Sequence, residues 1–194
     1  MKFQLIPTIA LLASAMTMAV AIPAQALTKT EYKAAGEVLS GERKAAITTC
    51  SPMKGNAKSV CVLEAKGKYT IAQSELDAQY KPSAKADMKV RDKRADVAYD
   101  IAKAKCKDLS GNPKDVCIKD AKSAKVAAKG DAKVAKIASE AKTDSTKKVV
   151  EARKDAMEDK SDAAYAAAKV RCDTLAGDLK TRCVNDAKAK FGKS

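Results

Sequence analysis

Three pairs of cysteines, each pair enclosing ten residues, constrain the fold of this 194-residue chain more than any other feature. On an unbroken helix, residues eleven positions apart are separated by roughly 16 Å along the axis. A disulfide requires Cα atoms about 5.5–6 Å apart. Each pair can therefore form a disulfide only if the chain folds back between its two members. The pairs are Cys50 and Cys61, Cys106 and Cys117, and Cys172 and Cys183.

Each pair also encloses a glycine followed by Asn or Asp, a combination typical of a helical hairpin. Glycine often follows a helix end because it accepts the left-handed backbone conformation. Asn and Asp are preferred N-cap residues, and Pro113 stands where the first residue of a second helix tolerates proline. We therefore predict a helix end at each glycine and an N-cap at the residue after it. These dipeptides are Gly55-Asn56, Gly111-Asn112 and Gly177-Asp178.

Small side chains flank every cysteine pair on the side away from the turn. Facing alanines would let two helices approach closely enough for a disulfide. They stand four residues before the first cysteine and four after the second, at Ala46, Ala65, Ala102, Ala121, Ala168 and Ala187. Tyr99 and Tyr165 stand seven residues before their cysteines, on the same helix face. We expect these tyrosines to close the seam within a hairpin; ligand stacking is the alternative.

The N-terminus has the pattern of a cleavable export signal. Lys2 precedes an almost wholly apolar run, Phe3–Ala21, and Ala24-Gln25-Ala26 then forms a small-x-small cleavage site. An uncleaved membrane anchor is the alternative. We predict that residues 1–26 are removed, so that the mature protein is periplasmic or secreted and has no integral membrane span.

Export determines how the six cysteines are interpreted. In an oxidising compartment, an even number of cysteines indicates disulfides. Six cysteines allow many connectivities, and the threefold repeat favours pairing within each copy. The chain contains no His and no C-x-x-C pair, so we predict no metal site and no cofactor. Since the commonest general base is also missing, we predict that the protein is not an enzyme.

The sequence predicts an all-α fold of three disulfide-stapled antiparallel helical hairpins. Ala and Lys dominate the chain, and both favour helices. Thr28 and Glu31 form a capping box, Pro82 interrupts helix, and residues 143–146 mark a softer break. With few large apolar side chains, we expect elongated hairpins with narrow Ala and Val seams, joined flexibly or stacked end to end. The predicted segments are a signal peptide, 1–26, and hairpins at 27–82, 83–144 and 145–194.

A large positive charge distinguishes the mature chain. Residues 1–26 contain one lysine and no acid, so 37 basic and 24 acidic residues remain, a net charge of +13. Such a surface favours anionic partners, with solubility alone as the alternative. A lysine follows each repeated glycine three positions later. These lysines, Lys58, Lys114 and Lys180, are the predicted first contacts with a polyanion.

The three copies share a core of Leu or Met, then Gly, then Asn or Asp, then Lys and Cys, at fixed spacing. This core resembles that of small exported, Ala/Lys-rich helical-hairpin proteins of Gram-negative bacteria. These are loosely labelled cell-envelope proteins by likeness to the helical stalk of TolA. The resemblance covers nearly the whole mature chain. It implies a helical, periplasmic, non-enzymatic protein and carries over no functional residues. TolA differs from this chain in keeping a membrane anchor.

These observations favour a periplasmic structural or interaction protein whose basic helices bind an anionic envelope polymer or lipid, or a periplasmic protein. An extracellular nucleic-acid binder is one alternative, suggested by the lysine-rich residues 121–142. DNA is less favoured as a partner because acidic residues between the lysines lower the local charge density against phosphate. A holdase-like stress protein is the other alternative.

Overall fold

The protein is helical throughout the residues that its computed structural model describes, which are 27–141 and 146–194. The predicted signal peptide and residues 143–145 of the predicted break lie outside the described residues. Six α-helices, one short 3₁₀ turn (Cys106–Asp108) and no strand occur in the described ranges, which confirms the all-α prediction. The helices are α1 (Lys29–Thr49), α2 (Gly55–Tyr80), α3 (Ala84–Lys105), α4 (Gly111–Glu140), α5 (Thr146–Cys172) and α6 (Gly177–Phe191).

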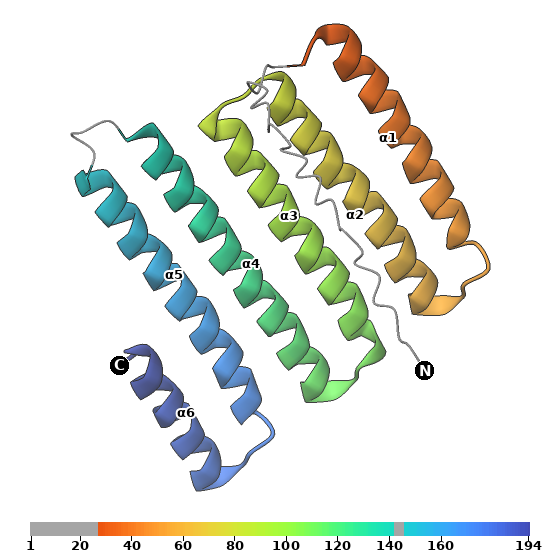
Figure 1. The fold of residues 1–194 in the computed structure, drawn as a ribbon. Helices are drawn as coiled ribbons and strands as arrows, with labels where there is room; N and C mark the ends of the chain where they lie inside the picture. The colour runs from red at the N-terminus through yellow and green to blue at the C-terminus, as the bar shows by residue number, and fades with distance from the viewer. Residues whose placement is uncertain (1–26, 142–145) are drawn as a thin grey trace, which may run out of the picture.

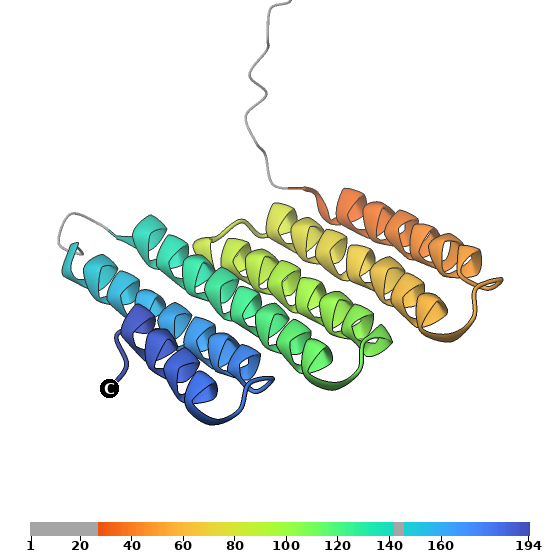
Figure 2. The same cartoon turned by 90° about the horizontal axis from the view of Figure 1, so that it is seen from below.

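The helices lie side by side in a single antiparallel layer (Figure 1). The helix pairs that pack extensively are consecutive in sequence, from α1 on α2 to α5 on α6. Seen from below, the helices follow one another in one staggered row (Figure 2). The hairpins therefore pack flank to flank, and the expectation that they are joined flexibly or stacked end to end is wrong. Contacts between hairpins, described below, hold them in this arrangement.

A disulfide joins the two helices of every hairpin, as predicted. The bonds are Cys50–Cys61, Cys106–Cys117 and Cys172–Cys183, with Cα–Cα distances of 5.7, 5.8 and 5.7 Å. Each hairpin returns the chain to the side from which it came, so all three disulfide turns lie along the same edge of the layer (Figure 1). We call this the disulfide edge.

The turn differs from the predicted one in where its glycine lies relative to the second helix. The three repeated glycines do have positive φ angles of 59°, 57° and 55°. Each glycine is, however, the first residue of the second helix, and the extended residue before it is the N-cap. The prediction that the following Asn or Asp is the N-cap is therefore wrong, because that residue already lies inside the helix. Its side chain is free to bond elsewhere.

Small residues form the core. Thirteen apolar residues of the described ranges are buried, of which eight are alanines and three are the first cysteine of a pair; Leu76 and Val90 are the other two. A layer one helix thick leaves two faces of every helix exposed, so only narrow strips of each helix meet a neighbour. Such strips are best filled by small side chains, which allow helix axes to approach closely.

Two helix starts agree with their sequence signals. Glu31 N–H donates to Thr28 Oγ1 at 3.2 Å, and Thr28 N–H donates to Glu31 Oε2 at 2.8 Å, so the predicted capping box is present. After Pro82, Ser83 Oγ accepts from Ala86 N–H at 3.0 Å and begins α3. The turn between α2 and α3, residues 81–83, lies at the edge opposite the disulfides (Figure 1).

Candidate functional site

The predicted contact lysines lie at the disulfide edge, next to the turns. Lys58 Nζ is 3.5 Å from Ser51 O, and Lys180 Nζ is 3.0 Å from Asp173 Oδ1. Ser51 and Asp173 each directly follow the first cysteine of their pair. In these two copies the repeated lysine therefore reaches back across its own turn. Its contact with a polyanion stays a prediction.

A pair of aromatic or cationic side chains lies beyond every disulfide. The residue seven positions before the first cysteine meets the residue eight positions after the second. Arg43 Cζ lies 4.6 Å from the Tyr69 ring centroid, Lys125 Nζ lies 4.8 Å from that of Tyr99, and the rings of Tyr165 and Phe191 are 6.4 Å apart. Such contacts stabilise a helix pair beyond simple area burial. The predicted seam position of Tyr99 and Tyr165 is confirmed.

A second repeated arrangement joins one hairpin to the next, and the sequence analysis missed it. Asn56 Nδ2 donates to Ala104 O at 2.8 Å, and Asn112 Nδ2 donates to Val170 O at 2.6 Å. Both acceptors lie in the last turn of the following hairpin's first helix, where carbonyls have no partner four residues further along the helix; the N–H groups of Cys106 and Asp173 also reach them. One sequence signal could have revealed this bond. The third copy has Asp178 in place of Asn, and a carboxylate cannot donate the hydrogen bond that Asn56 and Asn112 make to the following hairpin.

An ion pair accompanies each of these hydrogen bonds. The acid three positions after a hairpin's second cysteine pairs with the base just before the next hairpin's first cysteine. The pairs are Glu64 Oε1 with Lys105 Nζ at 2.9 Å and Asp120 Oδ1 with Arg171 Nη2 at 2.5 Å. In the first copy the position of the base is occupied by Thr49. The polar connection thus recurs at both junctions between hairpins.

A groove opens on the edge opposite the disulfides, between α1, α2, α3 and α4. Its volume is about 830 Å³, which lies within the range of about 300–1,000 Å³ typical of small-molecule sites. Tyr32, Tyr80 and Met88 form an apolar wall, and the two tyrosine rings stack with centroids 4.5 Å apart. Four lysines and two aspartates are among its other lining residues: Lys81, Lys85, Lys89, Lys136, Asp77 and Asp92.

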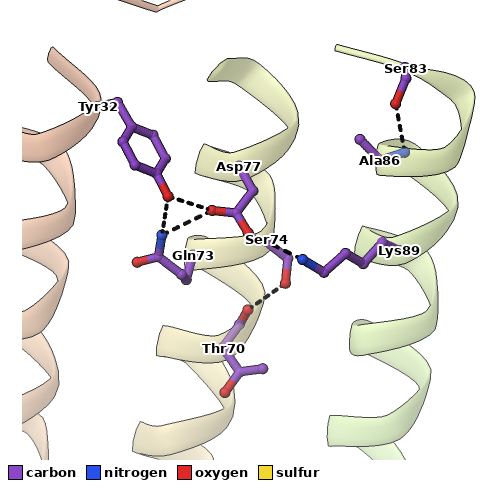
Figure 3. A network of polar contacts seen from close by, with 8 residues as sticks. All are labelled: Tyr32, Thr70, Gln73, Ser74, Asp77, Ser83, Ala86 and Lys89. Carbon is purple, nitrogen blue, oxygen red and sulfur yellow. Dashed lines mark hydrogen bonds and ion pairs between the residues drawn. The ribbon is translucent and has the colours of Figure 1, made fainter. Parts of the chain in front are cut away.

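A polar network holds one wall of this groove in place (Figure 3). Asp77 accepts hydrogen bonds from Tyr32 Oη at 2.9 Å, Gln73 Nε2 at 3.1 Å and Lys89 Nζ at 3.3 Å, and so connects α1, α2 and α3. Partial burial raises the pKa of Asp77, but the bonds from Gln73, Tyr32 and Lys89 outweigh it and hold the pKa below its ordinary 3.8. The hydrogen bond to Asp77, with some burial, raises the pKa of Tyr32. Asp77 is therefore an ionised, fully engaged acceptor at neutral pH.

The described part of the chain offers little else for chemistry. No three His, Cys, Asp or Glu side chains of residues 27–141 and 146–194 are placed to hold a metal ion. None of the described helices is long and apolar enough to cross a bilayer. Comparison with known proteins yields no match, whether to a family model, a curated protein or a solved structure. The positive charge and the groove are the features of the described chain that bear on function.

Proposed function

We propose that the protein is an exported, non-enzymatic structural and interaction protein of the cell envelope, whose basic helices bind an anionic envelope polymer or lipid. Three disulfides are typical of an oxidising environment outside the cytoplasm. The periplasm is the compartment that fits both this chemistry and the export signal expected at residues 1–26. A one-layer array exposes both faces of its helices, so much of its surface is open to a large partner.

The uneven distribution of charge carries this proposal. Helices α3 and α4 contain 14 basic and 8 acidic residues, a net charge of +6. Helices α1 and α2 contain 7 basic and 6 acidic residues, a net charge of +1. Helices α5 and α6 contain 11 basic and 7 acidic residues, a net charge of +4. A concentrated positive potential attracts polyanions and accelerates their association. The second hairpin is therefore the part of the array best suited to bind one.

The lysines of this hairpin gather on one face of the layer. On α4 they recur at intervals of seven, four and three residues, which places them in one stripe along the helix; on α3 they recur every four residues. Lys136 of α4 lines the same groove as Lys85 and Lys89 of α3, so the two stripes share a face. We call this the basic face; it comprises Lys85, Lys89, Lys93, Lys122, Lys129, Lys133 and Lys136.

Acidic residues only partly neutralise the basic face. Among the described residues, Lys85, Lys93 and Lys122 have no ion pair, whereas the other four lysines pair as Lys89–Asp77, Lys129–Asp96, Lys133–Asp155 and Lys136–Glu140. Lys125, beside the face, shares Asp96 with Lys129. Lys125 Nζ and Lys129 Nζ are both 2.8 Å from the same oxygen, Asp96 Oδ1. Burial raises the pKa of Asp96, but its hydrogen bonds from these two lysines lower the pKa by more. The pKa of Asp96 is therefore below its ordinary value. One carboxylate thus balances two ammonium groups and leaves an excess of positive charge.

Binding of the exported, oxidised protein to lipopolysaccharide, cell-wall sacculi and duplex DNA at low and physiological salt tests the proposal. We expect salt-sensitive binding that prefers an envelope component. Replacing Lys122, Lys129 and Lys133 by Gln should weaken it about tenfold or more. The matched control replaces Lys33, Lys44 and Lys66 of the first hairpin and should change binding little.

Three outcomes would overturn this assignment. Absence of binding at physiological salt would reduce the charge to a role in solubility. Preference for DNA would favour the nucleic-acid alternative, and suppression of client aggregation that persists at high salt would favour a holdase. A variant with Gln at Lys58, Lys114 and Lys180 tests the turn lysines separately. If that variant loses more affinity than the one on α4, the disulfide edge is the contact surface and the basic face is not.

A further inference from the structure

The groove opposite the disulfide edge differs from the rest of the basic face because it combines positive charge with apolar surface. We propose that it binds an anionic amphiphile, a molecule with a negatively charged headgroup and an alkyl or aromatic body. This inference rests on the proposed function, since it names a lipid-like ligand for one part of the basic face.

The charge of the groove selects an anion. Four lysines and two aspartates line it, so its net charge is positive even when both aspartates are ionised. Asp77 is already occupied by three donors, and one oxygen of Asp92 is buried. Among the described residues, Lys81 and Lys85 form no ion pair. These two exposed ammonium groups are the ones available to a headgroup.

The apolar wall selects a ligand with a body as well as a charge. Tyr32, Tyr80 and Met88 are only half-buried in the protein. The hydroxyl of Tyr32 is fixed by Asp77 and Gln73 (Figure 3), so the stacked rings are pre-organised. Met88 adds a flexible, polarisable side chain that adapts to irregular shapes. A small inorganic anion would leave this wall uncovered, whereas an amphiphile would cover it.

The geometry also indicates how the ligand lies. Lys81 Nζ is 5.5 Å from the centroid of the Tyr80 ring, so a lysine that can hold the headgroup stands beside the aromatic wall. Lys85 lies in the first turn of α3, on the other side of the 81–83 turn. A headgroup between these two lysines would direct its body along Tyr80, Tyr32 and Met88. The volume of about 830 Å³ accommodates a small-molecule ligand of this kind.

Calorimetric titration with dodecyl phosphate below its micellar concentration tests the inference. Inorganic phosphate represents the headgroup alone, and dodecyl maltoside represents an uncharged body. We expect dodecyl phosphate to bind one site at least tenfold more tightly than either. Replacing Lys81 and Lys85 together by Gln, or Met88 by Gln, should weaken binding at least tenfold. The matched control, Gln at Lys54 and Lys107, replaces two exposed lysines at the disulfide edge and should bind normally.

Several results would overturn the inference. They are equal affinity for inorganic phosphate, unchanged affinity in the groove variants, or no binding of the amphiphile by a protein whose circular dichroism shows intact helices. The variant of Lys122, Lys129 and Lys133 separates this inference from the proposed function. If this variant loses binding to sacculi but still binds dodecyl phosphate, the proposed function and the groove assignment are both supported. If the native protein binds dodecyl phosphate but no envelope polymer, only the groove assignment is supported.

A competition experiment distinguishes two sources of the same chemistry. Vesicles containing an anionic phospholipid should displace dodecyl phosphate if the natural ligand belongs to a membrane surface. If such vesicles do not compete, the ligand is a free amphiphile. Either result is compatible with the site, and together they determine whether the groove faces a membrane or captures monomers.

Discussion

The seam between α3 and α4 and the junction between α4 and α5 share one helix and are held together in different ways. Within the hairpin, the Cys106–Cys117 disulfide closes the seam, and Lys125 lies over the ring of Tyr99. This pattern recurs, with variation in the paired side chains, in the other two hairpins. The seam is thus a covalent connection reinforced by one aromatic contact.

The junction relies on close packing and polar contacts. A Cβ added at Gly130 of α4 would lie 3.2 Å from Ala156 Cβ of α5, so the two helices are in near contact there. Asn112 and Asp120 bond to the end of α5. All six cysteines are used within hairpins, so no disulfide crosses a junction. Covalent seams and non-covalent junctions therefore alternate along the array, and we expect the junctions to open more easily.

The largest effect should come from breaking a seam. Replacing Cys106 and Cys117 by Ser should lower the free energy of unfolding by about 3 kcal/mol, because the disulfide no longer restricts the unfolded chain. Denaturant unfolding monitored by circular dichroism measures this loss. Reduction of the native protein should lower stability further by opening all three seams. If reduction leaves helical content and melting unchanged, the disulfides do not have the structural role assigned to them.

The next effect should come from forcing a junction apart. Replacing Gly67 of α2 by Ala would place a Cβ in overlap with Cγ1 of Val97 on α3, and overpacking of this kind costs about 1–3 kcal/mol. The matched control is Gly36→Ala on α1, where a new Cβ meets nothing within 4 Å. It should be stabilising by about 0.5–1 kcal/mol, since alanine is the better helix former. Equal stability of the two variants would contradict close packing of α2 on α3.

A smaller loss should follow removal of one polar connection. Asn112→Ala should cost about 1 kcal/mol, because Val170 O at the end of α5 loses its side-chain donor and keeps only the N–H of Asp173 at 3.2 Å. Asn112→Asp should also destabilise, since it cannot donate. The reciprocal change in the third copy, Asp178→Asn, serves as the control and should leave the free energy of unfolding nearly unchanged. A gain in stability at position 178 as large as the loss at position 112 would show that Asn acts within its own turn.

The smallest effect concerns Asp77, which belongs to a seam through Tyr32 and to a junction through Lys89. Its pKa in the folded protein is below the ordinary 3.8. The ionised form therefore contributes stability above that value, and the contribution disappears as the pH falls through the folded pKa. Thermal unfolding between about pH 2 and pH 7 measures this contribution. The native protein should be more stable than Asp77→Asn at neutral pH, and the difference in stability should disappear only at the acid end. If the difference in stability between the two proteins is constant across this range, the ionised carboxylate of Asp77 is not its source.

Local signals account for the parts of the fold that were predicted correctly. The capping box at Thr28 and the break at Pro82 depend on residues a few positions apart. The cysteine spacing allowed one simple geometry, which the disulfides adopt. The role of Asn56 was predicted wrongly because N-cap preference is a local statistic. The actual acceptor is the carbonyl of Ala104, 48 residues further along the chain.

The groove could not be predicted for a related reason. Tyr32, Tyr80, Met88 and Lys136 come from four helices, and no spacing in the sequence connects them. Helical periodicity reports which residues share a face of one helix. It does not report which face of the next helix they meet. Only the lysine stripe of α4, which lies on a single helix, could have been recognised in advance.

The amino-acid sequence by itself determined the helices, their turns and the disulfide within each hairpin, because capping, helix propensity and loop closure act over about a dozen residues. The tertiary structure alone decided that the hairpins pack flank to flank, that Asn56 and Asn112 link them, and that tyrosines and lysines of separate helices form one groove. These features depend on contacts between residues tens of positions apart. Such contacts are selected by the fit of whole helix surfaces, where glycine and alanine permit close approach and carbonyls at helix ends require donors.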